Sequence, residues 1–139
     1  YPASLFSAIL VASLIAFLFY NKYPSKVFPG DTLTYPVGAS IAMVAILGNI
    51  ERFALMLFFP FYIEFLLKAR GKFNPEWTAL VLEDGSLIIR DKWYTLPHVV
   101  ISFLRKLKGK AYEYEVVLVI LALEIVVAFI TIISYLRVP

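Results

Sequence analysis

Residues 116–136, VVLVILALEIVVAFITIISYL, decide the class of protein to which this chain belongs. The stretch holds one charged side chain, Glu124. At about 1.5 Å of rise per residue, a helix of this length crosses the hydrocarbon core of a bilayer, which is about 30 Å thick. The stretch therefore predicts a transmembrane helix.

Three more apolar stretches predict further spans. Residues 3–20 and 33–50 carry no charged side chain, and residues 53–67 are apolar apart from Glu64. Pro60 lies inside this third stretch and predicts a kink, because proline cannot donate the backbone hydrogen bond of a helix. The expected fold class is an all-α multi-pass membrane protein with four transmembrane helices.

The composition supports this class and excludes others. Hydrophobic residues make up 61% of the 139 residues, whereas soluble domains are about 45 to 50% apolar. The chain has no cysteine, which excludes disulfides and thiolate metal sites. The net charge is +3, but the basic residues flank apolar spans instead of forming one block. We therefore expect the lipid bilayer as a partner and no nucleic acid.

A polar segment at 70–114 separates the third and fourth spans and is too long for a simple connection. Two aliphatic runs flank Asp84 and Gly85, which predicts a β-hairpin with a two-residue turn. We accordingly divide the chain into residues 1–69, 70–114 and 115–139. These ranges hold the first three spans, a loop domain and the last span.

The second half of the polar segment has the pattern of an amphipathic helix with a basic end. Such a helix lies in the membrane interface with its apolar side toward the acyl chains. The apolar positions at helical spacing are Leu96, Val99 or Val100, Phe103, Leu104 and Leu107. Trp77 and Trp93 are expected to be anchors at the membrane interface.

The basic residues predict the orientation of the chain. All of the 13 lysines and arginines except Arg52 and Arg137 lie in the loop at 21–32 or in and beside the segment 70–114. Cytoplasmic loops carry an excess of such residues. With four spans both segments fall on the same side, so we expect both to face the cytoplasm.

The loop at 21–32, NKYPSKVFPGDT, places an acid beside a glycine at a membrane boundary. One interpretation is structural, since aspartate before a helix is an ordinary N-cap and Pro29 and Gly30 are ordinary turn residues. The other is functional. Asp31, with Lys22 and Lys26 nearby, would hold a divalent cation and its phosphate ligands, because Mg²⁺ is usually held by one or two carboxylates plus phosphate oxygens.

The order of residues in this loop resembles the NxxPSxVFxGDT signature of the polyprenyl-phosphate N-acetylhexosamine-1-phosphate transferase superfamily. The following TLTYPVG is similar to the branch of the eukaryotic and archaeal dolichyl-phosphate N-acetylglucosaminephosphotransferases. The matching residues are Asn21, Pro24, Ser25, Val27, Phe28, Gly30, Asp31 and Thr32.

The resemblance also covers the topology, because the last four spans of the family carry this motif and a long cytoplasmic loop in the same places. The aspartate pair of the family belongs to its N-terminal half, and no such pair occurs here. The resemblance thus implies the C-terminal portion of an enzyme, inactive without its N-terminal half.

The implied reaction transfers GlcNAc-1-phosphate from UDP-GlcNAc to dolichyl or another polyprenyl phosphate, the first step of lipid-linked oligosaccharide assembly for N-glycosylation. The resemblance implies that Asp31 is catalytic and binds Mg²⁺, with Mn²⁺ as the alternative ion, and that Phe28 packs against the uracil. Asn21 and Gly30 are expected to contact substrate. The implied location is the archaeal plasma membrane or the endoplasmic reticulum membrane, with the active site facing the cytoplasm.

Other interpretations remain open at this stage. His98, the single histidine, either contacts substrate or is a polar residue in the first turn of a helix. Glu64 is expected to pair with Lys68, four residues along the same helix, and Glu124 with a span outside the chain. The alternatives for function are another donor, such as UDP-MurNAc-pentapeptide, or a non-enzymatic membrane subunit. A second copy of the chain is a candidate partner.

Overall fold

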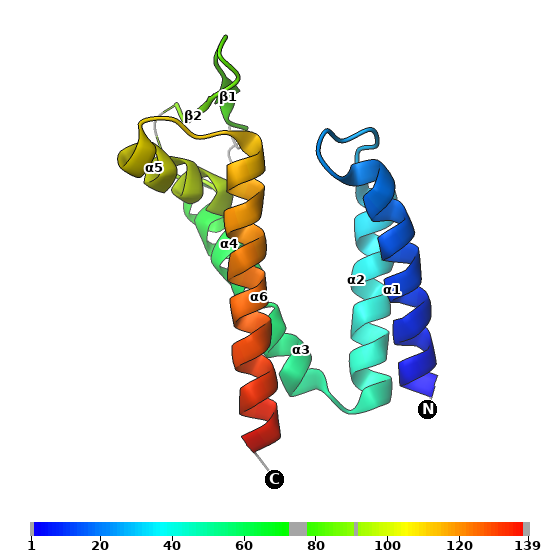
Figure 1. The fold of residues 1–139 in the computed structure, drawn as a ribbon. Coiled ribbons are helices and arrows are strands. Elements are labelled where there is room, and N and C mark those ends of the chain that lie inside the picture. Colours follow the sequence, from blue (N-terminus) through cyan, green and yellow to red (C-terminus); the bar gives the residue numbers. More distant parts are fainter. Residues whose placement is uncertain (1, 73–77, 91, 138–139) are drawn as a thin grey trace. The chain divides into compact units, whose positions relative to one another are not determined.

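A computed structural model describes residues 2–72, 78–90 and 92–137 of the chain. They form helices and one small antiparallel sheet, as expected of an all-α membrane protein. The chain divides into two compact units, Tyr1–Met56 and Leu57–Pro139, and each is described by itself (Figure 1). Trp77, expected to be an interface anchor, lies outside the described residues.

The first unit is built on two helices that run side by side in opposite directions, α1 (Pro2–Asn21) and α2 (Asp31–Gly48) (Figure 1). No residue of α1 is buried, and in α2 only Ala45 is. Both helices are long and apolar enough to cross a membrane. Helices with apolar side chains on every side are stable only in lipid or inside a larger protein. The predicted spans at 3–20 and 33–50 are helical as expected.

The predicted third span is not one continuous helix. Its residues form α3 (Glu51–Leu57) and α4 (Phe59–Arg70), with an interruption at Phe58. The cause is Pro60 in the first turn of α4, which has no N–H for the carbonyl of Met56 and whose ring crowds that carbonyl. The expected kink is thus a break between two helices, and neither has the length of a span. Among the described helices, α1, α2 and α6 (Glu113–Arg137) are candidate spans.

The predicted β-hairpin is present, but its two-residue turn is wrong. Strands β1 (Leu80–Val81) and β2 (Leu87–Ile88) pair antiparallel. Beyond them, Leu82 N–H donates to the Ser86 carbonyl oxygen at 2.9 Å, which leaves three residues in the loop. Gly85 ends this loop in the left-handed region, at φ +76°, as the three-residue hairpin turn requires.

Helix α5 (Leu96–Lys108) is bounded by residues suited to helix ends. Thr95 is the N-cap and its side chain accepts from the His98 N–H, and Gly109 follows the last turn with φ +78°. Glu64 of α4 accepts a 2.5 Å hydrogen bond from the Leu96 N–H, one of the amides that lacks a partner within α5.

Glu64 has a second partner on its own helix. Its other carboxylate oxygen lies 3.1 Å from Lys68 Nζ, which confirms the predicted ion pair. The carboxylate of Glu64 therefore pairs with a lysine in the last turn of α4 and accepts a hydrogen bond from the first turn of α5. The bond to α5 was not predictable, because it joins residues far apart in the sequence.

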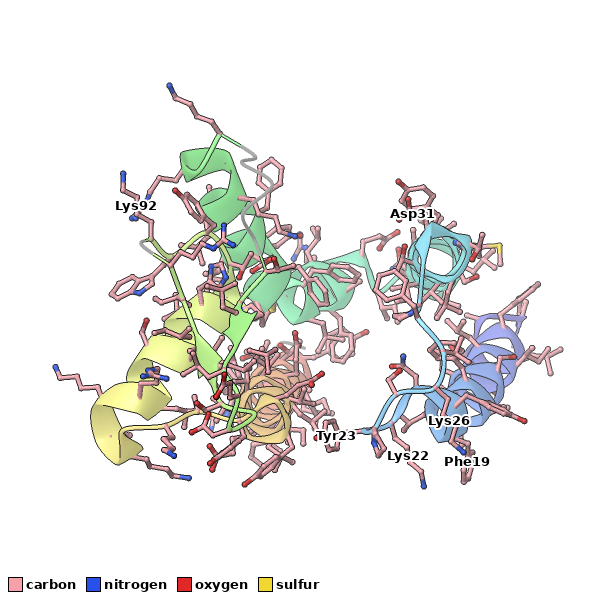
Figure 2. All side chains as sticks on the ribbon, turned by 90° about the horizontal axis from the view of Figure 1, so that it is seen from above. Phe19, Lys22, Tyr23, Lys26, Asp31 and Lys92 are labelled. Carbon is pink, nitrogen blue, oxygen red and sulfur yellow. The ribbon has the colours of Figure 1, made fainter. Side chains whose placement is uncertain are left out.

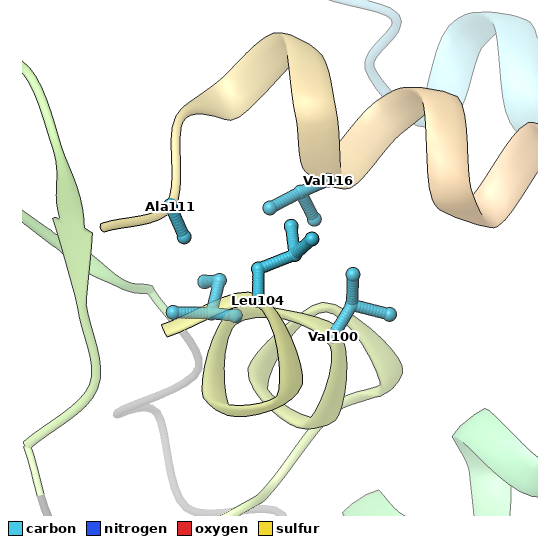
Figure 3. Packing of buried hydrophobic residues seen from close by; sticks show 5 residues of the cluster. Val100, Leu104, Ala111 and Val116 are labelled. Atoms are coloured by element: carbon cyan, nitrogen blue, oxygen red, sulfur yellow. The ribbon is translucent and has the colours of Figure 1, made fainter. Parts of the chain in front are cut away.

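The core of the second unit lies where α5, α6 and the hairpin meet. Its fully buried members come from α5, α6 and the connection between them (Figure 3). Leu87, Ile89, Ala79 and Ile120 pack against this cluster and are partly buried. The five buried residues are Val100, Ile101, Leu104, Ala111 and Val116.

The predicted apolar face of α5 is only partly correct. Val100 and Leu104 are buried in the protein core instead of facing acyl chains, and Ile101 completes the buried face, whereas Phe103 and Leu107 are exposed. The reason is that α6 and the hairpin cover only one side of the helix. An exposed apolar pair beside a basic end suits a helix in the membrane interface, which stays a prediction.

Polar contacts hold the hairpin against the connection between α5 and α6. The Leu87 N–H donates to the Ala111 carbonyl oxygen at 2.7 Å, and Asp84 lies 2.7 Å from Lys110 Nζ. Hydrogen bonds from Lys110 and from Ser86 hold the pKa of Asp84 well below its usual range. Because this pair is exposed, it orients the turn more than it stabilises the fold.

The two leucines of α5 allow a matched test of this core. Leu104→Ala should lower the stability of the complete protein by about 2 to 4 kcal/mol, because it opens a cavity in the packed cluster. Leu107→Ala should cost far less, since the exposed fraction of Leu107 is 65% against 6% for Leu104. Thermal unfolding in detergent, followed by tryptophan fluorescence, measures both. Equal losses would contradict the assigned core.

Candidate functional site

The loop between α1 and α2 is held in shape by two polar residues of its own. The Asn21 side-chain N–H donates to the Val27 carbonyl oxygen at 2.8 Å and to Ser25 Oγ at 3.3 Å. Ser25 Oγ donates to the same carbonyl at 2.9 Å. These bonds tie the end of α1 to the residue before Phe28. The amide nitrogen of Asn21 therefore serves the loop, and its predicted contact with substrate stays a prediction.

Phe28 is the most exposed apolar side chain of this loop, with an exposed fraction of 89%. Leaving a phenylalanine in water instead of burying it costs on the order of 2 kcal/mol. The Gly30 N–H donates to the Phe28 carbonyl oxygen at 3.0 Å, which closes a tight turn around Pro29. The loop thus presents a flat aromatic surface at its outside, a surface on which a planar ring can stack.

Gly30 is the N-cap residue of α2, where Asp31 was one candidate for this role. Its carbonyl oxygen accepts from the Leu33 and Thr34 N–H groups at 2.9 and 3.2 Å. Its φ of −55° is one that any residue adopts. A Cβ at this position would lie 4.0 Å from Phe28 Cδ1, an ordinary contact. Neither backbone conformation nor packing within the chain therefore requires glycine here.

Asp31 is the first residue of α2, and its side chain is exposed and makes no capping hydrogen bond. The interpretation of Asp31 as an N-cap is therefore wrong. Within the described part of the chain, no hydrogen bond or ion pair engages its carboxylate. The N-terminus of a helix carries a partial positive charge that attracts anions. A charged oxygen donor is thus presented beside first-turn amides, which are groups that bind phosphate.

The two lysines of the loop do not flank this carboxylate. Figure 2 shows Lys22 and Lys26 at the α1 side of the loop, away from Asp31 at the start of α2. Lys22 Nζ lies 5.7 Å from the ring centroid of Phe19, in a cation–π contact. The expectation that both lysines lie close to Asp31 is thus not met.

His98 belongs to the second unit and is a buried residue in the first turn of α5, with an exposed fraction of 3%. Its Nδ1 accepts a hydrogen bond from the Tyr94 N–H at 3.3 Å, and the two rings meet edge to face. This hydrogen bond requires that Nδ1 carry no proton. The imidazole therefore packs the segment before α5, and its predicted contact with substrate stays a prediction.

The donor set around Asp31 limits what the chain can bind by itself. Among the described residues, no three of the types His, Asp and Glu come together as a metal site would require. Asp31 offers one carboxylate, which fits Mg²⁺ only if phosphate oxygens, water or other protein groups complete the shell. The residues present thus fit a metal that arrives with a phosphate ligand.

Long apolar helices joined by a motif loop define an integral membrane protein. Residues 1–49, which include both helices of the first unit and their loop, match the model of glycosyl transferase family 4. The chain belongs to this family, and the superfamily and branch indicated by the motif are confirmed.

Curated relatives extend the similarity beyond the first unit. A protein of Saccharolobus solfataricus, provisionally named UDP-N-acetylglucosamine–dolichyl-phosphate N-acetylglucosaminephosphotransferase, is 35% identical over 96% of this chain. The Dictyostelium discoideum enzyme of the same name is 47% identical over 52% of the chain and 22% of its own length. A phospho-N-acetylmuramoyl-pentapeptide-transferase of Carboxydothermus hydrogenoformans is 39% identical over 45% of the chain and 19% of its own length. The chain spans 40% of the Saccharolobus protein.

Alanine substitutions at two glycines test whether the fold requires a glycine in the motif. Gly30→Ala should leave thermal stability unchanged, because its φ suits alanine and the added Cβ meets no close neighbour. Gly85→Ala is the matched control and should cost about 1 to 2 kcal/mol, since φ +76° disfavours any residue with a Cβ. Thermal unfolding of the complete protein in detergent measures both. A loss at Gly30 as large as that at Gly85 would refute this account of the loop.

Proposed function

We propose that this chain is the C-terminal portion of a membrane enzyme that transfers GlcNAc-1-phosphate from UDP-GlcNAc to dolichyl phosphate. The observation that carries the proposal is the state of Asp31. Its carboxylate is exposed at the N-terminus of α2 and is used neither as a helix cap nor in an ion pair with a described residue. The names of the relatives in Saccharolobus and Dictyostelium support the donor and the carrier.

Different residues of the loop bind different parts of the nucleotide. Asn21 and Ser25 hold the backbone before Phe28, and the exposed ring of Phe28 stacks on the uracil. Gly30 leaves open space between this ring and Asp31, where a side chain would stand in the way of the diphosphate. Asp31 would provide a carboxylate ligand for Mg²⁺, or Mn²⁺ in its place, and the substrate, water and the N-terminal half would have to supply the other ligands.

The reaction is a phosphoryl transfer. A phosphate oxygen of dolichyl phosphate attacks the β-phosphorus of UDP-GlcNAc, the bond from this phosphorus to the bridging oxygen breaks, and UMP leaves with that oxygen. A divalent cation held by Asp31 would offset the negative charge that develops on the leaving phosphate. The protein contributes by aligning the two phosphates and excluding water. The products are UMP and the lipid-linked pyrophosphoryl sugar.

The place of the motif suits two substrates that arrive from different phases. The loop connects two helices long enough to cross a membrane, so it lies at a membrane boundary. A carrier held in the bilayer and a nucleotide dissolved in the cytosol both reach such a boundary. Lys22 and Lys26 within the loop itself support its cytoplasmic orientation.

The first test removes the charge of Asp31. Asp31→Asn should abolish Mg²⁺-dependent transfer of radiolabelled GlcNAc-phosphate to dolichyl phosphate by the complete enzyme, since a neutral amide binds the cation poorly. Expression and thermal stability should stay unchanged, because the carboxylate has no partner in the described part of the chain. Glu51→Gln is the matched control, another exposed acid at the first position of a helix, and should keep full activity.

Retained activity in Asp31→Asn would remove Asp31 from the mechanism. Supplying UDP-MurNAc-pentapeptide in the same assay tests the alternative donor. If the unsubstituted enzyme uses only UDP-MurNAc-pentapeptide, the proposed donor UDP-GlcNAc is wrong, but the proposed phosphoryl transfer is unaffected.

The second test concerns the aromatic surface. Phe28→Ala should raise the KM for UDP-GlcNAc about tenfold with a smaller change in kcat, because base stacking is worth about 1 to 3 kcal/mol. Phe19→Ala, a similarly exposed ring at the end of α1, is the control and should leave the KM unchanged. Steady-state kinetics with varied UDP-GlcNAc provide the comparison. An unchanged KM in Phe28→Ala would argue against uracil stacking.

A further inference from the structure

An open pocket of about 360 Å³ lies at the C-terminal end of α4, within the second unit. Among the residues that the structure describes, three of the five that line it are cations and none is an acid. The lining residues are Arg70, Gly71, Lys72, Lys92 and Tyr94. All five residues belong to the second unit, and none of them has a role in the proposed transferase reaction.

The pocket has a defined backbone. The Gly71 N–H continues the hydrogen bonding of α4 to the Leu67 carbonyl oxygen at 3.1 Å, and Lys72 then turns into the left-handed region, at φ 52°. A Cβ on Gly71 would clash with Tyr94 Cδ1, so the tyrosine ring packs directly on the glycine backbone. The Tyr94 N–H in turn donates to His98 Nδ1. The buried histidine therefore supports one wall of the pocket.

Within the described part of the chain, the three cations of this pocket, Arg70, Lys72 and Lys92, have no ion-pair partner. Elsewhere in the same unit Lys108 and Lys110 pair with Glu115 and Asp84 at 2.8 and 2.7 Å. Three like charges brought together repel one another unless an anion lies among them. The arrangement is therefore suited to an anion with several oxygens, such as a phosphate group.

The helix that leads into the pocket presents an apolar face. Tyr62, Leu66 and Arg70 recur every four residues along α4, so they share one face of the helix. Leu66 is 65% exposed, and Tyr62 is exposed as well. An apolar face that ends in a cluster of cations matches an anionic lipid, whose acyl chain and phosphate are joined in the same order.

We propose that the pocket formed by Arg70, Lys72 and Lys92 binds the phosphate group of an anionic membrane lipid. The guanidinium and the two ammonium groups surround the headgroup phosphate, and the acyl chain lies along the Tyr62 and Leu66 face of α4. The exposed leucine beside the cations favours a lipid over a free phosphate, because a soluble anion has no apolar part to cover it. This proposal does not depend on the transferase activity.

The test uses the complete protein in detergent and native mass spectrometry, with phosphatidylglycerol as the anionic lipid and phosphatidylcholine as the zwitterionic one. The triple variant Arg70→Gln, Lys72→Gln, Lys92→Gln should bind phosphatidylglycerol at least about tenfold more weakly, since each of the three cations attracts the anionic headgroup. Binding of phosphatidylcholine should change little.

A control variant removes the same charge from the same unit. Lys106→Gln, Lys108→Gln, Lys110→Gln should weaken phosphatidylglycerol binding less than about threefold, because two of these lysines are already paired with acids. Lys92→Gln alone, outside any helix, should give an intermediate loss and guards against a triple variant that fails to fold. Thermal unfolding of each variant checks the fold.

Two outcomes would overturn the proposal. Equal losses in the triple variant and its control would mean that net charge alone attracts the lipid. Displacement of phosphatidylglycerol by UDP or pyrophosphate, but not by inorganic phosphate at the same ionic strength, would assign the pocket to the diphosphate of a nucleotide. Selective loss in the pocket variants, without such displacement, would support a lipid site whether or not the enzyme assay succeeds.

Discussion

The hydrogen-bonding requirement of the bilayer is the constraint on which the rest of this structure depends. A backbone polar group without a partner in hydrocarbon costs several kcal/mol, so the chain crosses the membrane as helices that satisfy their own N–H and C=O groups. Helices α1, α2 and α6 have this form. The four N–H groups that begin each helix and the four C=O groups that end it stay unsatisfied within it. Polar chemistry therefore gathers at the helix ends.

Different helix ends in this chain meet that need in different ways. At the start of α5, Thr95 and Glu64 supply oxygen acceptors for backbone amides, and the end of the helix is completed by Gly109. At the start of α2, the Gly30 carbonyl accepts from the first turn, and the carboxylate of Asp31 is left over. An acid that the helix does not use is available for a ligand. This difference separates a structural helix end from one suited to chemistry.

Much of the fold could be predicted because it depends on local patterns. Apolar length alone identifies α1, α2 and α6, and a glycine after an aspartate identifies the hairpin. The motif likewise identified Asp31 and Phe28 as site candidates. Pro60 was expected to bend a span, but whether proline kinks or interrupts a helix depends on the packing around it. The hairpin loop has three residues instead of the predicted two, because a hydrogen bond between Leu82 and Ser86 closes it.

The sequence by itself determined that the chain is a membrane protein, where its long helices lie, and to which family it belongs, because span length and a contiguous motif are both local in sequence. Only the tertiary structure decided which face of α5 is buried, since that depends on where α6 and the hairpin pack. It also decided that Glu64 bonds to α5, that His98 supports Tyr94, and that Arg70, Lys72 and Lys92 share one pocket. The Glu64 bond and the pocket join residues across loops, and their geometry exists only after the segments have packed together.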